Sequence, residues 1–263
     1  MSNETKKEFH SRNVTLGAGL SDQYAPVDTK ILLTPFLNKG WTVNGNTKLD
    51  SKGKHLIELI HEDYKYHNGD SLNIQCLNSY DGSSALMLMG GYGRIACSNG
   101  LILGDIEGGR FVHRGLKIYD KIEHSYETII AHLDEMKDRV AKLKGLEVPE
   151  HQQNLVTHAV LKAMYEKETK KYKTEIVNIR DNTVRRLNHT RRDADLGTDA
   201  FTRLNVLQEN IIRFGVSRLM IKTTNKETKT SEITYVRKGG NENKLDSIKM
   251  NKIIADEYLK LVG

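Results

Sequence analysis

The chain has 263 residues, of which 38% are hydrophobic and 28% charged, a composition that suits one large globular domain or two small ones. No run approaches roughly 18 consecutive apolar residues, and the polar N-terminus lacks the apolar core of a signal peptide, so we expect a cytoplasmic protein that neither spans a membrane nor is secreted. The net charge of +6 is compatible with a polyanionic partner, although it identifies none.

The N-terminal part is predicted to hold a flexible arm, a helix and the first strands. Residues 1–20 are poor in apolar side chains, which favours a flexible arm ahead of a single domain over residues 21–263. Val27–Leu37 is predicted to form a short helix. Trp41–Asn44 and His55–Tyr64 are predicted strands, because polar and apolar residues alternate along them.

The next segment is the clearest candidate for antiparallel strands, because short apolar runs alternate with strong turn dipeptides. Leu72–Asn78 is a predicted strand, Asp81-Gly82 predicts a tight turn after it, and Asn99-Gly100 predicts a second tight turn. Gly90-Gly91 is predicted to interrupt or bulge the strand between the two turns. Short strands joined by such turns form antiparallel sheets.

Helices are predicted in the second half of the chain. From Ser125 the apolar residues recur every three or four positions, and this helix is expected to stop at Gly145. Pro149 is predicted to open a long helix that continues, with an interrupted apolar stripe, to about Asn188. A further helix is predicted over Asp199–Arg213, with its apolar stripe toward the core.

A hairpin formed by Ser217–Thr223 and Ser231–Arg237 and a closing helix over Ser247–Leu261 complete the prediction. The whole pattern predicts an α+β fold, in which an antiparallel β-sheet packs against helices, with one long basic helix and a C-terminal hairpin and helix. Cys76 and Cys97 lie in apolar runs and are expected to be buried, reduced thiols.

Positive charge is concentrated in one segment. Leu155–Arg192 contains ten Lys or Arg residues against four acidic ones, a surplus of +6 that equals the net charge of the whole chain. Five arginines lie near the predicted end of the long helix: Arg180, Arg185, Arg186, Arg191 and Arg192. Such a cluster is either a solvated face that favours the helix dipole or a surface for nucleic-acid phosphates.

Two stretches carry a family resemblance, NSYDGSSALMLMGGYGRIACSNGLILG at 78–104 and DAFTRLNVLQENIIRFG at 199–215. Together with SDQYAPV at 21–27 and FVHRG around His113, and in this order, they resemble the phage/plasmid-like family called domain of unknown function 932. The chain departs from the family pattern in the Lys-rich run 166–173 and at Arg114, directly after the histidine. The resemblance implies a phage or plasmid origin and no particular activity.

A candidate polar site combines a hairpin end, the helix predicted over Asp199–Arg213 and the histidine that the resemblance singles out. Its residues are Asn78, Ser79, Asp81, His113, Asn205 and Glu209. The hairpin residues either satisfy backbone groups of the turn or present hydroxyls and amides to a ligand. Asn205 and Glu209 flank the apolar stripe of the helix, and if they are buried they need polar partners, for which Asn78 and Ser79 are the candidates.

Tyr92 and Arg94 lie in a glycine-rich run that matches neither a phosphate-binding P-loop nor a dinucleotide-binding motif. They either mark a bend in the sheet or, with Arg114, contact nucleic acid by stacking and phosphate binding. The histidines lack the spacing of a metalloprotease or a zinc finger, and a nucleophile elbow is absent from the sequence. We therefore expect no metal and no cofactor, and a binding protein before an enzyme.

The leading hypothesis is a nucleic-acid-binding protein of a phage or plasmid, with single strands favoured, that binds or anneals them in replication or recombination in the host cytoplasm. The first alternative is an interaction protein that inhibits a host or defence factor, and the second is an enzyme with a polar site around His113. A homo-oligomer and a host protein stay open as partners, and no membrane contact is expected.

Overall fold

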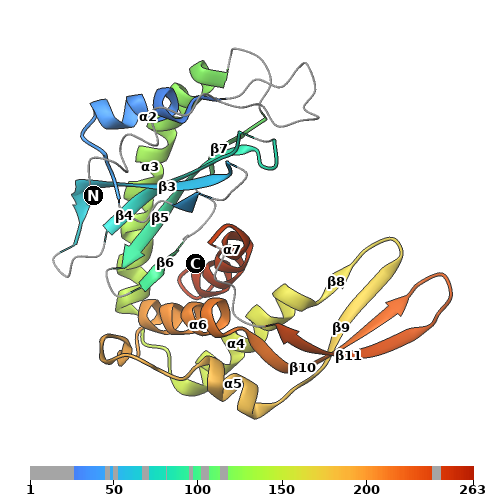
Figure 1. Cartoon of the computed structure of the whole chain (residues 1–263). Coiled ribbons are helices and arrows are strands. Elements are labelled where there is room, and N and C mark those ends of the chain that lie inside the picture. Colours follow the sequence, from blue (N-terminus) through green and yellow to red (C-terminus); the bar gives the residue numbers. More distant parts are fainter. Residues whose placement is uncertain are drawn as a thin grey trace. The chain divides into compact units, whose positions relative to one another are not determined.

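The computed structural model describes residues 27–44, 48–49, 53–66, 71–80, 82–94, 97–101, 107–112, 118–238 and 244–263. The chain divides into two compact units (Figure 1). The first comprises the described residues up to Gly100 and from 107 to Lys137, and the second comprises Leu101 and the described residues from Asp138 onward. Compact units can belong to one folding domain, so the single domain over 21–263 stays a prediction. The expected arm, 1–20, lies outside the described residues.

The first unit is built around one antiparallel sheet. Its elements are α2 (Thr29–Asn38), β1 (Thr42–Val43), β2 (Lys48–Leu49), β3 (His55–Lys65), β4 (Ser71–Asn78), β5 (Leu86–Arg94), β6 (Cys97–Leu101), β7 (Glu107–Phe111) and α3 (Ile118–Gly145), which continues into the second unit. The sheet order is β1-β3-β4-β5-β6, with β2 beside β3 and β7 beside β5. The predicted α+β class and antiparallel strands are confirmed.

The core of this unit forms where the apolar periods predicted it. Every residue of β4 is buried, because this strand is central in the sheet. The predicted stripe of α3 is also buried: Ile129, Leu133 and Met136 lie in this unit, and Val140 and Leu143 lie in the second. The rings of Phe36 on α2 and Tyr126 on α3 lie 5.2 Å apart, which joins the two helices. Cys76 is buried and free, as expected, and burial raises the pKa of its thiol.

Of the two hairpin turns predicted in this sheet, the one at Asp81-Gly82 joins antiparallel strands as expected but is longer, and the one at Asn99-Gly100 is wrong. β4 ends at Asn78 and β5 begins at Leu86, so the connection is longer than a two-residue turn at Asp81-Gly82. This wider loop is held by Ser79, whose hydroxyl donates to the carbonyl of Ser84 at 2.9 Å. Asn99-Gly100 lies inside β6, next to β5, because pairing within the sheet outweighs the turn preference of the dipeptide. Gly90-Gly91 pairs with Asn73 and Ile74 in regular register.

The second unit consists of helices and a four-stranded sheet. Its elements are the end of α3, then α4 (Glu150–Tyr165), β8 (Lys167–Glu168), β9 (Tyr172–Ile179), α5 (Asp181–Leu187), the 3₁₀ turn η1 (Asp193–Asp195), α6 (Ala200–Phe214), β10 (Val216–Asn225), β11 (Ser231–Lys238) and α7 (Lys244–Leu259). The sheet order is β11-β10-β9-β8, and all pairs are antiparallel. Figure 1 shows these strands, in yellow to red, extending away from α4 and α5.

The long basic helix expected from Pro149 to about Asn188 is wrong. α4 ends at Tyr165, and the chain then forms β8, β9 and the short α5. The Lys- and Glu-rich run 166–173 has good intrinsic helix propensity, which explains the expectation. Pairing of β9 with β10 overrides that propensity. The β8–β9 turn is closed by Tyr172, whose backbone N–H donates to the hydroxyl of Thr169 at 2.9 Å.

The predicted helix over Asp199–Arg213 is confirmed as α6. Asp199 caps it by accepting the backbone N–H of Thr202 at 2.9 Å, and Gly215 ends it with a φ of 72°, a conformation that favours glycine. Its predicted core residues are all buried: Phe201, Leu204, Leu207 and Ile211. The predicted C-terminal hairpin and closing helix are confirmed as β10, β11 and α7.

Candidate nucleic-acid interface

The five clustered arginines divide into two groups. Arg180, just before α5, and Arg185, on α5, are exposed. Arg186 donates from Nη2 to the carbonyl of Gly215 at 3.2 Å. Arg191 donates from Nε to Asn210 at 2.7 Å and lies 4.1 Å over the ring of Phe214.

Arg192 forms an ion pair with the buried carboxylate of Glu209, which Arg213 also contacts at 3.4 Å. Together with the contacts of Arg186 and Arg191, this pair shows that three of the five arginines hold the fold of their own unit. Arg186 and Arg192 are half-buried, whereas Arg191 is exposed although it bonds Asn210, and a role of the five arginines in binding nucleic acid stays a prediction.

Three consecutive polar residues of α6 are buried and position this segment. Gln208 donates to Asn251 on α7 at 2.6 Å. Asn210 donates to the carbonyl oxygens of Leu187 and His189 at 2.8 and 2.9 Å. Glu209 accepts from Arg192. The three side chains thus hold α6 to α7 and to the segment that follows α5. This part of the family resemblance therefore has a structural role.

Asn205 and Glu209 have their polar partners inside the second unit. The side-chain amide of Asn205 donates to the carbonyl of Phe201, one helical turn earlier, at 2.6 Å. Glu209 forms ion pairs with Arg192 and Arg213. Asn78 and Ser79, the partners expected from the sequence, lie in the first unit and bond there. The hydrogen bonds therefore assign the two halves of the candidate polar site to separate structural roles.

In the first unit, Asn78 belongs to a buried network at the start of α2. The hydroxyl of Thr29 lies 2.7 Å from His55 Nε2, 3.0 Å from Asn78 Nδ2 and 2.7 Å from the hydroxyl of Tyr80. Asn78 also donates to the carbonyl of Val27 at 3.0 Å. These contacts join two segments of the family resemblance, the one ending at Val27 and the hairpin end, and they explain the polar residues there as a clamp.

The side chains of several predicted site residues lie outside the described part of the structure. Tyr92 and Arg94 lie in β5, where Tyr92 pairs with Leu72, but their side chains are outside the part of the chain that the structure describes. Asp81, His113 and Arg114 lie outside the described residues altogether. Among the residues that are described, the structure holds no group of three or more His, Cys, Asp or Glu side chains suited to a metal, and no helix that could span a bilayer.

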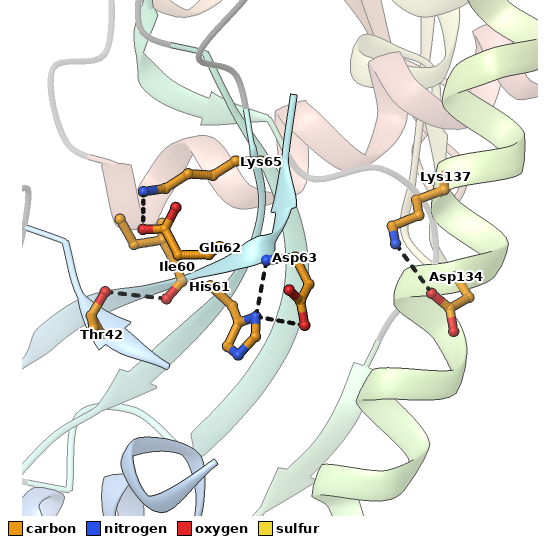
Figure 2. A network of polar contacts seen from close by, with 8 residues as sticks. All are labelled: Thr42, Ile60, His61, Glu62, Asp63, Lys65, Asp134 and Lys137. Atoms are coloured by element: carbon orange, nitrogen blue, oxygen red, sulfur yellow. Dashed lines mark hydrogen bonds and ion pairs between the residues drawn. The ribbon is translucent and has the colours of Figure 1, made fainter. Parts of the chain in front are cut away.

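Charges on β3 and α3 of the first unit are balanced locally (Figure 2). Lys65 forms an ion pair with Glu62 at 2.5 Å, and Lys137 forms one with Asp134 at 3.6 Å. His61 Nδ1 accepts the backbone N–H of Asp63 at 3.2 Å and lies 3.6 Å from its carboxylate. Lys65 and Lys137 thus each have an acid three residues away in sequence.

The sheet of the second unit has one closed and one open face. Cross-strand partners point to the same side of a sheet, so the pairing registers assign the faces. Leu219 and its partners Ile179 and Val236 point to the closed face, where Leu219 is fully buried. α5 lies against this sheet, and Thr183 donates to the carbonyl of Ser217 at 3.1 Å.

The open face carries two exposed apolar side chains of β11. Tyr235 lies beside Met220, and Ile233 beside Lys222, in neighbouring rows. Tyr235 is 53% exposed and Ile233 54%. The exposed apolar residues of β9 lie elsewhere: Tyr172 is on the closed-face side, and Val177 lies in the bulge, where no pairing assigns its face. Ile233 and Tyr235 thus place two exposed apolar side chains side by side on the open face, which indicates a contact surface.

Basic residues surround this face. We call residues 167–179 and 216–238 the sheet arm; it contains ten Lys or Arg residues against four Glu, a net charge of +6. Lys170, Lys171 and Lys229 are exposed in its two turns. On the open face, a hydrogen bond with Glu175 at 2.7 Å raises the pKa of Lys173, and one from Lys226 at 2.5 Å lowers the pKa of Glu168.

Sequence reasoning found the basic segment but not this face. The sequence does contain a sign of the face, because Ile233 and Tyr235 alternate with polar residues in a predicted strand, but the sequence does not show the register in which the neighbouring strand pairs with it. Only the register of β11 against β10 places both residues beside Lys222 on the open face.

Comparison with known proteins gives a family and distant relatives. A family described as domain of unknown function 932 matches residues 18–245. The chain is 27% identical over 165 residues to UPF0380 protein YafZ of Escherichia coli K12, and 29% identical over 167 residues to UPF0380 protein YfjQ of the same organism. Each match covers 62% of this chain and 56% of the relative, so the chain spans about half the length of the curated relatives it matches. No solved structure matches the chain.

Proposed function

The chain belongs to the family of domain of unknown function 932, whose description assigns no activity, and we propose from the chain's own surface that it binds nucleic acid through the open face of its sheet arm. The observation that carries the proposal is the combination of a half-exposed Tyr235, set beside Ile233 on one open face, with a surplus of +6 in the same arm. Proteins that bind single-stranded nucleic acid commonly combine aromatic side chains, which stack on bases, with surrounding basic residues, which contact phosphates.

Single strands are the favoured ligand. The open face is a sheet surface, so its ring can stack only on a base that is not already stacked in a duplex. The lysines of the two turns and the exposed Arg180 and Arg185 lie at opposite ends of β9 and β10, where they can meet phosphates. Single-strand binding or annealing in the cytoplasm, during replication or recombination, is the role that we propose, and the family resemblance implies only that the DNA is that of a phage or plasmid.

Tyr235→Leu is expected to weaken binding to a fluorescent single-stranded oligonucleotide by about 5- to 150-fold, because one stacked base contributes about 1–3 kcal/mol. The dependence of log Kd on log salt should stay unchanged, since stacking releases no counterions. Tyr172→Leu is the matched control: Tyr172 is 42% exposed in the same sheet but on the closed-face side. Fluorescence anisotropy over a salt series measures both quantities, and equal losses in the two variants would contradict the assignment of the face.

Replacing Lys170, Lys171 and Lys229 with Gln is expected to reduce the salt slope by about 2, because each phosphate contact on a single strand contributes about 0.7. The control triple is Lys30, Lys121 and Lys142, which are exposed outside the sheet arm and carry the same charge. An identical change of slope in the control would mean that net charge alone acts. Absence of binding by the wild-type chain at low salt would refute the function and favour the alternative, docking of a host protein on the apolar part of the face.

A further inference from the structure

β11 forms one edge of the described sheet, and its outer side has the backbone groups of an unpaired strand. It has eight residues, and each is paired with a residue of β10 on the inner side, while Arg218 of β10 bulges out of the pairing. The opposite edge, β8, has only two residues. The middle of β11 is Ile233, Thr234 and Tyr235, all exposed, with no charge or proline to block strand addition.

The turn determines which backbone groups of β11 point outward. The N–H of Asn225 donates to the carbonyl of Thr230 at 2.9 Å, which makes this the first hydrogen-bonded pair of the hairpin. Hydrogen-bonded and non-hydrogen-bonded pairs alternate along antiparallel strands. The register runs without a shift from this end to Leu219. Ile233 and Tyr235 are therefore in non-hydrogen-bonded pairs with β10, and their N–H and C=O groups point away from the sheet.

We infer that β11 pairs with β11 of a second copy of this chain, antiparallel and about a two-fold axis at Thr234. This register places Ile233 of each copy opposite Tyr235 of the other, and both residues have outward N–H and C=O groups, as a hydrogen-bonded pair requires. Thr234 lies opposite its own copy in the non-hydrogen-bonded pair between them. The two most exposed apolar side chains of the strand then become cross-strand neighbours, an aromatic–β-branched pair that stabilises sheets.

The charge pattern of the strand favours an antiparallel copy over a parallel one. Glu232 lies near the start of β11, and Arg237 and Lys238 lie at its end. An antiparallel copy brings the acidic start of each strand toward the basic end of the other, whereas a parallel copy places like charges side by side. The pairing joins two four-stranded sheets into one, and both open faces lie on the same side of it.

A cysteine at Thr234 tests the pairing directly. Opposite residues in a non-hydrogen-bonded pair have Cα atoms about 4.5 Å apart, within the range of a disulfide. Under mild oxidation, Thr234→Cys should form a covalent dimer about tenfold faster or more than Ser231→Cys, because only position 234 meets its own copy. Ser231 is exposed on the same strand, and the wild-type chain, oxidised in parallel, measures cross-linking through native thiols.

A second variant removes one outward donor. Ile233→Pro deletes an N–H that β10 does not use, and proline is tolerated in edge strands. Light scattering should give twice the chain mass for the wild type and the single mass for Ile233→Pro, with the circular dichroism spectrum retained. A wild-type chain that is monomeric up to its solubility limit, equal cross-linking at positions 234 and 231, or a dimeric Ile233→Pro would each overturn the inference.

Discussion

Thr29→Val should lower the free energy of unfolding of the first unit by about 3–5 kcal/mol, because it removes one hydroxyl that three other polar groups use. His55 and Asn78, two of the three partners, are fully buried, so water cannot replace the lost hydrogen bonds. Valine has nearly the shape of threonine, so the loss measures the unsatisfied polar groups and not a cavity.

The hydrogen-bonding pattern explains why the hydroxyl is hard to replace. His55 Nδ1 lies 2.8 Å from the carbonyl of Gly53, so this nitrogen carries the ring proton and donates it. Nε2 must then accept, and Thr29 is the donor 2.7 Å away. The two lone pairs of the same hydroxyl receive Asn78 and Tyr80. One oxygen thus serves as donor once and as acceptor twice.

The chain's single tryptophan, Trp41, is buried in this unit and reports its unfolding in denaturant by fluorescence. Thr34→Val is the matched control, because Thr34 is exposed on the same helix and bonds only the carbonyl of Lys30. Its effect should stay within about 0.5 kcal/mol. Similar shifts of the midpoint for both variants would show that the network contributes no more than an exposed hydroxyl.

Much of the fold could be predicted from the sequence because many elements carry their own signal. The end of α6 follows from Asp199 before an apolar stripe and Gly215 after it, and the stripe of α3 follows from its period. The run 166–173 failed because lysine and glutamate favour helix locally, whereas the pairing of β9 depends on β10, which lies forty residues or more further along the chain. Asn99-Gly100 failed in the same way, inside β6.

The candidate site was only partly predictable, for a related reason. The basic composition of the segment is visible in the sequence, but whether an arginine is available to a ligand depends on its tertiary partners. Arg185 is exposed, whereas Arg192, seven residues later, is half-buried and pairs with Glu209, and the exposed Arg191 bonds Asn210. Likewise, the exposure of Tyr235 follows from which face of the sheet α4 and α5 leave open.

Glu209→Ala is expected to lower the free energy of unfolding of the second unit by about 2–3 kcal/mol, because it leaves a partly buried guanidinium without its counter-ion. The side chain of Glu209 is 7% exposed and that of Arg192 23%, which places the loss below that of a fully buried pair. Arg213 is 59% exposed and can turn to water. The main consequence should therefore fall on the segment that holds Arg192, between α5 and η1.

Hydrogen exchange locates this effect. Amides of residues 188–196 should exchange faster in Glu209→Ala than in the wild type, whereas those of β10 and β11 should keep their protection, since their ladder does not involve this carboxylate. Glu227→Ala, in the exposed turn between β10 and β11, is the control. In a double-mutant cycle, Arg192→Ala should cost little more once Glu209 is absent. Additive losses, or faster exchange confined to the sheet arm, would show that the ion pair does not anchor the segment and that its arginines are free for a ligand.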